Sequence, residues 1–364
     1  MVLKSILWVL GLLVGFVLLV KGADFFVDGA SGIAKKLHVS TFIIGLTVVA
    51  LGTSAPEAAV SIIGGIKAAM GDSSGAEVIM GNVLGSNMMN ILLILGISAL
   101  ITKLPVEKSS RYIEIPFLII ISLLFIFLGD WGKGFAWYDG LILLALYGAF
   151  MAYTIIMAKR SKPALLNEEA ISATTTYAPA EPVSFKEKVS AKYEELKAKT
   201  WFLIILTIVG LAMVVGGAEL VVEGATFIAK DLIGIPTGIV ALTVVAFGTS
   251  LPELVTSVSA ARKGDMGLAT GNIIGSNIAN LLFVAGLGFV STGAAGAPFD
   301  ASSIADGYVS IIAATLLLGF SFIKGNKLGK IAGITFLIVL VGYYAYRICA
   351  VCGLCPMLTI PTIF

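Results

Sequence analysis

Long apolar stretches separated by short polar segments make up most of the chain. A helix needs about 20 apolar residues to cross the hydrocarbon core of a bilayer, so stretches of this length predict transmembrane helices. We expect ten of them, at 5–33, 39–68, 75–101, 112–129, 136–158, 201–229, 236–261, 267–291, 304–323 and 330–349. The pattern therefore predicts an all-α, polytopic membrane protein with ten transmembrane helices.

The composition agrees with a chain that lies mostly in lipid. Only 13% of the residues are charged, 58% are hydrophobic, and the mean hydropathy is +1.02. Soluble domains carry about 25% charged residues. The net charge of +2 gives no reason to expect a nucleic-acid partner. No Ser-Lys, His-Asp or metal-binding His arrangement lies at membrane depth, so we do not expect an enzyme or a cofactor.

Residues 160–199 interrupt the apolar pattern. This stretch contains Pro163, Pro179 and Pro182 among many Lys and Glu residues, which predicts a solvated linker, with a short amphipathic helix at 184–199. Of the 24 Lys and Arg residues, 18 lie in loops that follow odd-numbered spans and five lie on the other side. Positive loops stay in the cytoplasm. We therefore expect a cytoplasmic linker and two extracytoplasmic termini in a multi-pass cell-membrane protein.

The chain contains two copies of one pattern. Residues 39–57, VSTFIIGLTVVALGTSAPE, match 235–253, IPTGIVALTVVAFGTSLPE, and 81–90, GNVLGSNMMN, match 271–280, GNIIGSNIAN. Residues 22–30, GADFFVDGA, match 217–225, GAELVVEGA. Because each copy holds five spans, the second copy enters the membrane from the opposite side, which is the inverted repeat of many transporters. The expected parts are 1–159 and 200–349 as transmembrane repeats, 160–199 as linker and 350–364 as a C-terminal tail.

The matched GTSxPE blocks predict broken helices at membrane depth. Pro56 has no N–H to donate and pushes Ala55 away from helical geometry, so the helix should break there. Acidic side chains inside a membrane are costly and mark function. Glu57 and Glu253 therefore define a candidate site, with the hydroxyls of Thr53, Ser54, Thr249 and Ser250 beside them. Asp24, Asp28, Glu219 and Glu223 are interpreted as access-path or packing residues.

The Gly-Asn segments should complete this site. Ser86 and Asn90 lie one helical turn apart on a shared face, and Ser276 and Asn280 repeat the arrangement. Gly81, Gly85, Gly271 and Gly275 would let helices approach closely. The predicted ligands are all oxygen atoms, which suits a hard cation, and their number suits Ca²⁺ better than Mg²⁺. Two carboxylates can balance one divalent ion or two monovalent ions.

These paired motifs resemble the sodium/calcium exchanger family of the calcium:cation antiporter superfamily. The resemblance covers nearly the whole chain apart from the linker and the extreme C-terminus. It implies exchange of Ca²⁺ for Na⁺ by alternating access, with spans two, three, seven and eight around the ions. It adds the backbone carbonyls of Ala50 and Ala246 to the ligands, and it implies that the first and sixth spans form a long sliding pair.

Three alternatives stay open at this stage. Many relatives carry Asp at the position of Asn280, and potassium-dependent members carry an acid there, so Asn280 argues against potassium dependence. A proton/calcium exchanger would typically place acids in a GNxxE-like setting, which the chain lacks. A calcium-permeable channel is the alternative of a different class.

Cys349, Cys352 and Cys355 lack a fourth ligand for a metal and are interpreted as thiols of the tail, and His38 as an interfacial residue. The sequence does not predict an oligomeric state.

Overall fold

The structure is a computed structural model that describes residues 2–72, 74–172, 192–228, 233, 246–323 and 325–351. Eight of the described helices are long and apolar enough to cross a membrane. The number rises to nine if Thr41–Thr53 and Ala55–Ala69, which meet at an angle of 45°, form one bent span. The expected span at 236–261 is described only from residue 246 onward.

The helices and strands follow one another closely along the chain. The first part holds α1 (Val2–Leu37), α2 (Thr41–Ile44), η1 (Gly45–Val49), α3 (Ala50–Thr53), α4 (Ala55–Ala69), α5 (Ser74–Met88), η2 (Met89–Leu95), α6 (Gly96–Ile101), β1 (Leu104–Pro105), η3 (Ser110–Glu114), α7 (Ile115–Trp131), β2 (Gly134–Phe135) and α8 (Trp137–Ser172). The second part holds α10 (Thr200–Phe227), α12 (Ala246–Thr249), α13 (Leu251–Arg262), α14 (Met266–Ala279), η7 (Asn280–Val284), α15 (Ala285–Ser291), η8 (Gly293–Ala295), β3 (Ala297–Pro298), α16 (Ala301–Ser321), β4 (Lys327–Leu328) and α17 (Lys330–Val351). Apart from η8, a 3₁₀ turn, the η elements are π-helical turns.

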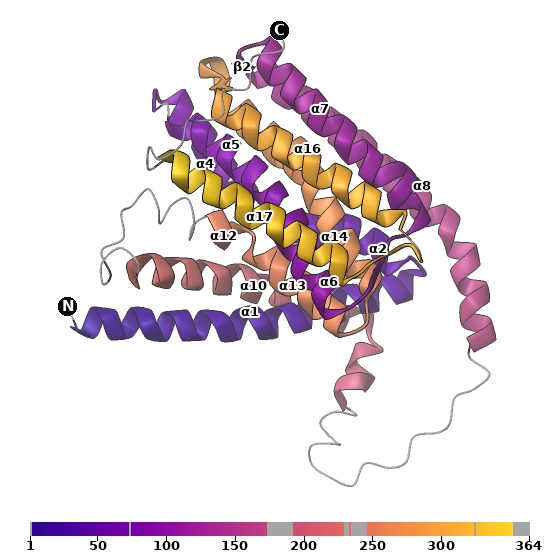
Figure 1. Ribbon diagram of the computed structural model, residues 1–364. Coiled ribbons are helices and arrows are strands. Elements are labelled where there is room, and N and C mark those ends of the chain that lie inside the picture. The colour runs from indigo at the N-terminus through magenta and orange to yellow at the C-terminus, as the bar shows by residue number, and fades with distance from the viewer. Residues whose placement is uncertain are drawn as a thin grey trace.

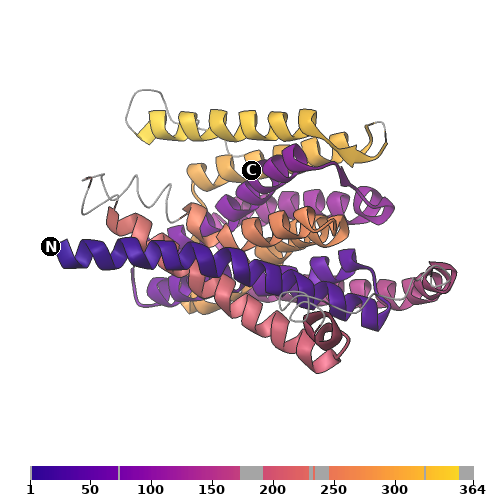
Figure 2. The same cartoon turned by 90° about the horizontal axis from the view of Figure 1, so that it is seen from below.

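The long helices α1 and α10 lie side by side along one edge of the molecule (Figures 1 and 2). Glycine makes their crossing close. A Cβ atom added to Gly210 would lie only 2.8 Å from the carbonyl oxygen of Gly22, which is inside van der Waals contact. Many apolar side chains on the first half of α1 are exposed, as expected for a helix that faces lipid. The pair is therefore tightly joined internally and exposed to lipid on its outer side.

The centre of the molecule is built around α14. Every residue from Leu268 to Ala279 in this helix is buried. It packs against α2, η1 and α3 of the first copy and against α13 of the second. Helix α4 packs against α5 and α15. The helices that carry the paired motifs thus form the inner layer, and α7, α8, α16 and α17 lie outside them (Figure 1).

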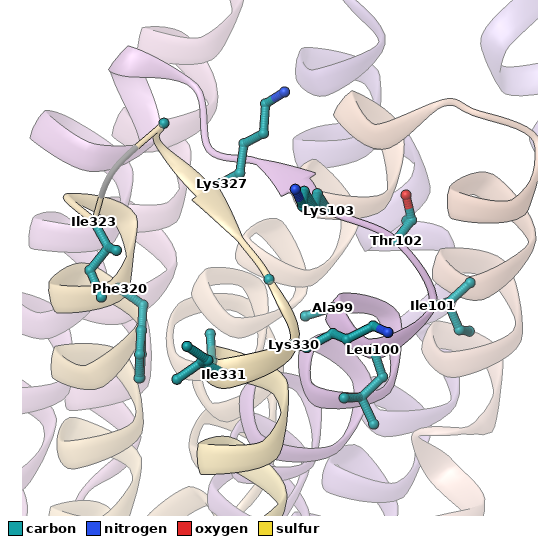
Figure 3. A pocket seen from close by; sticks show the side chains of 13 residues that line it. Ala99, Leu100, Ile101, Thr102, Lys103, Phe320, Ile323, Lys327, Lys330 and Ile331 are labelled. Carbon is teal, nitrogen blue, oxygen red and sulfur yellow. The ribbon is translucent and has the colours of Figure 1, made fainter.

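Two short antiparallel strand pairs join the two halves of the chain. β1 pairs with β4, and β2 pairs with β3. A cavity of about 720 Å³ lies beside the β1–β4 pair, where Lys103, Lys327 and Lys330 surround an apolar floor (Figure 3). No residue that lines this cavity belongs to the predicted ion site. The strand pairs were not expected from the sequence.

The described ends of the spans agree with the apolar segments to within a few residues, and two boundaries differ for physical reasons. The break before Pro56 falls at Ser54, while Ala55 already belongs to α4. Helix α8 continues past its apolar part to Ser172, into the predicted linker and through Pro163. Ala164, Leu165 and Glu168, which follow the proline, are strong helix formers. Residues 192–197 are helical within the predicted 184–199 helix, and 173–191 lie outside the described residues.

Candidate functional site

The two broken helices have the same local geometry. Ser54 has φ −83° and ψ 8°, and Ser250 has φ −86° and ψ 2°, so both residues leave the helical conformation at corresponding positions. Pro56 and Pro252 then stand in the first turn of α4 and α13, where a missing N–H costs nothing. This position explains why Ala55 remains helical and the residue before it does not.

Glu57 and Glu253 each lie in the first turn of the helix that follows the break. The positive end of a helix dipole stabilises a carboxylate there. Both side chains are 0% exposed, and the two carboxyl groups lie close enough to repel each other when ionised. Helix dipoles offset only part of the cost of burying a charge. A cation between the two carboxylates would offset both their repulsion and the cost of burying them.

Hydroxyl groups connect the two copies across the site. Ser54 donates a 3.0 Å hydrogen bond to Glu253 Oε1, and the Thr53 hydroxyl lies 3.5 Å from that of Ser276. Ser86 donates to Glu57 Oε1 at 3.5 Å. The structure therefore brings six of the predicted ligands from both copies into one buried cluster.

Several buried polar atoms of the predicted ligands have no hydrogen-bond partner among the described residues. They are Oε2 of Glu57 and of Glu253, the hydroxyl of Ser250 and both polar atoms of the Asn90 and Asn280 amides. Buried polar groups are nearly always paired, so the unpaired oxygen atoms of these residues are available to a ligand. No three His, Cys, Asp or Glu side chains cluster in the described ranges.

Asn90 and Asn280 occupy the same place in the two copies. Asn90 is the second residue of the π-helical turn η2, and Asn280 is the first residue of η7. Both side chains are 0% exposed. π-Helical turns within α-helices occur frequently at functional sites because they redirect side chains and free backbone groups. The turns support the assignment of both amides to the site.

The remaining predicted ligands are placed less completely. Ala50 is buried, and its carbonyl oxygen accepts hydrogen bonds from the Thr53 hydroxyl at 3.3 Å and the Ser54 N–H at 3.0 Å. Ala246 begins α12, and its side chain lies outside the described set. Thr249 ends α12 and is half-buried. The roles of the Ala50 and Ala246 carbonyls stay predictions.

The close approach expected of the glycines is seen on one side of the site. A Cβ atom on Gly275 would lie 2.8 Å from Cβ of Ala50, and one on Gly271 would lie 2.9 Å from N of Leu46. Gly81 and Gly85 have no described atom within 4 Å, so the corresponding contact stays a prediction.

Asn82 and Asn272, which the motifs did not single out, form hydrogen bonds to the helices that carry Glu57 and Glu253. Asn82 donates to the carbonyl oxygen of Glu57 at 2.8 Å and to the hydroxyl of Ser61 at 2.9 Å. Asn272 donates to the hydroxyl of Ser257 at 2.9 Å and accepts from Thr53 at 3.2 Å. The repeat contained the signal, since each asparagine follows the first glycine of its block and each serine lies four residues after its glutamate.

Replacing Asn82 or Asn272 by Ala is expected to lower Ca²⁺ affinity by roughly 10–100-fold, the usual cost of losing a group that orients a metal ligand. The folded protein should persist, because each change removes one side chain and no charge. Ca²⁺-dependent thermal stabilisation of the purified variants measures the effect. Thr335→Ala in α17, which removes an exposed hydroxyl that bonds only its own helix, is the control. Unchanged affinity in both asparagine variants would contradict the orienting role.

Fold and site together describe a multi-span membrane protein with a buried cluster of carboxyl and hydroxyl groups. The family model described as sodium/calcium exchanger protein matches residues 7–156 and 202–349. The chain belongs to the sodium/calcium exchanger family. It is similar to the putative antiporter CaxA of Alkalimonas amylolytica, with 35% identity over 91% of this chain and 95% of that protein. It is also similar to sodium/calcium exchanger MaX1 of Methanosarcina acetivorans, with 37% identity over 76% of this chain and 81% of the relative.

Solved structures of a sodium-calcium exchanger share the fold. The structure of NCX_Mj soaked with 2.5 mM Na⁺ and 10 mM Sr²⁺ matches with a TM-score of 0.73 and 32% identity, covering 94% of this chain and 99% of that one. The chain is thus an all-helical, multi-span membrane protein of a family of ion exchangers.

Proposed function

We propose that the protein exchanges Ca²⁺ for Na⁺ across the membrane by alternating access to one midplane site. The observation that carries this proposal is the cluster at Glu57 and Glu253. It joins two buried carboxyl groups from two broken helices with several unpaired oxygen atoms. The names of MaX1 and NCX_Mj add support from relatives that cover most of the chain.

The chemistry of the cluster accounts for selectivity and for coupling. Ca²⁺ takes six to eight oxygen ligands in flexible geometry, whereas Mg²⁺ demands a rigid octahedron. Carboxylate, hydroxyl and amide oxygens from four helical segments meet the requirement of Ca²⁺ for many oxygen ligands in flexible geometry. Na⁺ also binds oxygen, so the two ions compete for the same pair of carboxylates. When the loaded site faces only one side at a time, this competition couples the two opposing fluxes.

Alternating access in this proposal uses an inverted repeat of ten spans, with the positive loops in the cytoplasm. The strand pairs support this arrangement. β1 follows the third span and pairs with β4, which lies between the ninth and tenth; β2 lies between the fourth and fifth spans and pairs with β3, which follows the eighth. If each span of the first copy is exchanged for the corresponding span of the second, the β1–β4 pair becomes the β3–β2 pair. A two-fold axis in the membrane plane requires this correspondence. The linker then lies in the cytoplasm and both termini outside.

Calcium flux into vesicles that contain the purified protein tests the proposal. An outward Na⁺ gradient is expected to drive Ca²⁺ uptake, and uptake should stop when the gradient collapses. A proton gradient alone should drive none. Uptake that follows only the proton gradient would make the protein a proton/calcium exchanger. Uptake that follows the Ca²⁺ gradient and the voltage without any counter-ion would make it a channel.

Asn280 leads to a separate prediction about potassium. Its amide offers a neutral oxygen, so the site has two ionisable groups, and sodium-driven uptake should persist without K⁺. Asn280→Asp would place a third carboxyl beside two others, where repulsion makes it harder to ionise. Transport by this variant should therefore depend more steeply on pH near neutrality. Vesicle flux across a pH series, with and without K⁺, measures both effects. An absolute K⁺ requirement in the unmodified protein would refute this role of Asn280.

A further inference from the structure

A group of charged side chains joins α1 to the end of α13. Lys263 Nζ lies 2.8 Å from Asp28 Oδ1 and 3.8 Å from Asp24 Oδ1, and it donates to the Asp24 carbonyl oxygen at 2.6 Å. The Ser259 hydroxyl donates to Asp24 Oδ1 at 2.7 Å. These contacts hold α1 against α13 at the end of the bundle that the positive loops assign to the cytoplasm.

Further contacts strengthen the same junction. Ser31 of α1 donates to Asp265 at 2.5 Å, just after the end of α13. Lys197, which precedes α10, lies 3.4 Å from Asp28 Oδ2, and Tyr193 donates to the same oxygen at 3.1 Å. Asp28 therefore connects α1 to α13 and to the segment that enters α10.

The repeat carries the same charges a second time. Lys263 lies ten residues after Glu253, and Lys67 lies ten residues after Glu57, so the two lysines are at corresponding positions. Lys67 lies in the last turn of α4, and Lys263 directly follows α13. Asp24 and Asp28 correspond to Glu219 and Glu223 in the matched blocks of α1 and α10. Each acid pair is four residues apart and so lies on one helix face. The chain thus has the components of a second junction, between α10 and α4.

The second junction is open in this structure. Within the described residues, no ion pair joins Lys67 to Glu219 or Glu223, and all three side chains are exposed. The Thr226 hydroxyl, which corresponds to that of Ser31, has no described partner. Helix α1 packs along α13, whereas α10 makes no comparable contact with α4 in the described residues. Lys263 thus forms ion pairs with Asp24 and Asp28, whereas the corresponding charges at Lys67, Glu219 and Glu223 are apart in the described residues.

We propose that Lys263 with Asp24 and Asp28, and Lys67 with Glu219 and Glu223, form two ion-pair latches that close in alternation. The proposal rests on the alternating access proposed above. The closed Lys263 latch holds α1 on α13 and shuts the cytoplasmic path to the site. When the α1–α10 pair moves to its other position, this latch opens. The Lys67 latch then closes, holds α10 on α4 and shuts the outer path.

The exposure of these groups suits a reversible device. Partly exposed ion pairs are screened by water and contribute little free energy. Each latch can therefore bias the two states without trapping either one. Because the latches have matching charges, breaking one shifts the balance towards the state that the other stabilises. The residues act on which face is open and leave the ion ligands untouched.

A distance measurement between the outer ends of α4 and α10 tests the proposal. Spin labels at Met70 and Ala225, in the full chain with its three cysteines replaced by Ser, report this separation in lipid vesicles by pulsed electron resonance. Lys263→Glu should raise the ratio of short to long distances about three- to tenfold, and Lys67→Glu should lower it by a similar factor. Combining Lys263→Glu with Lys67→Glu should return the ratio towards its original value, because both latches are then broken.

Arg262→Glu is the matched control, since it makes the same charge change one residue away from Lys263 and no described ion pair holds Arg262. It should leave the distances unchanged. The latches are refuted if Lys263→Glu behaves like Arg262→Glu, or if the protein with both Lys263→Glu and Lys67→Glu keeps the ratio of Lys263→Glu alone. Because the readout is a distance, loss of sodium–calcium exchange in vesicles would overturn the proposed function without imitating either result.

Discussion

Replacing Glu253 by Gln is expected to abolish calcium transport while the protein remains inserted and folded, and Glu57→Gln should do the same. Each change removes one of two negative charges that face a divalent ion at the buried cluster. A unit charge about 4 Å away is worth about 4 kcal/mol at an effective dielectric constant of 20, so the loss should be on the order of 100-fold or more. Uptake into sodium-loaded vesicles measures it.

The same substitutions should not destabilise the ion-free protein. Two buried carboxylates that repel each other cost free energy when no cation is bound, and an amide of the same shape removes that cost. The variants should therefore melt at or above the temperature of the unmodified protein, yet gain nothing from Ca²⁺. Glu114→Gln is the control, because Glu114 is equally buried but bonds Tyr153, away from the cluster. Normal transport by either site variant would refute the site.

Gly275→Ala is expected to cause the second large loss. The added methyl group would lie 2.8 Å from Cβ of Ala50 and would also clash with the carbonyl oxygen of Leu46. Overpacking of a dense core costs typically 1–3 kcal/mol, and here it would push α14 away from the broken helix. Because Ser276 is the next residue, ion binding should fall together with stability.

Thermal unfolding and Ca²⁺ binding of the purified Gly275→Ala variant measure this loss. Gly148→Ala in α8 makes the same change where no described atom lies within 4 Å. It should unfold at the same temperature as the unmodified protein or slightly higher, since Ala favours helix more than Gly does. Equal behaviour of the two variants would show that the α14 contact does not position the site.

The spans and the core of the site could be predicted because their signals are local or repeated. Apolar length indicated the helices, and Pro56 with Glu57 indicated a break beside a buried acid. The repeat then paired these features with Pro252 and Glu253, and the structure brings Glu57 and Glu253 into one cluster. Because the motif occurs twice, the interpretation of the first copy also applied to the second.

Features that depend on contacts between distant segments could not be predicted. The π-helical turns at Met89–Leu95 and Asn280–Val284 contain no proline or glycine that would indicate them in the sequence. The two-residue strands pair loops far apart in the sequence. The hydrogen bond that Asn272 accepts from Thr53 of the other copy joins residues 219 positions apart, and the repeat does not indicate it. The strand pairs and the contact of Asn272 with Thr53 depend on distant segments of the chain, which the local sequence does not reveal.

Diffraction from crystals soaked in Sr²⁺, a heavier substitute for Ca²⁺, tests the central claim most directly. One strong anomalous peak is expected between the carboxylates of Glu57 and Glu253, within about 2.3–2.6 Å of oxygen ligands from both copies. The peak should fade as Na⁺ in the soak increases, because both ions use the same carboxylates. A peak away from both glutamates, or one that Na⁺ leaves unchanged, would contradict the account.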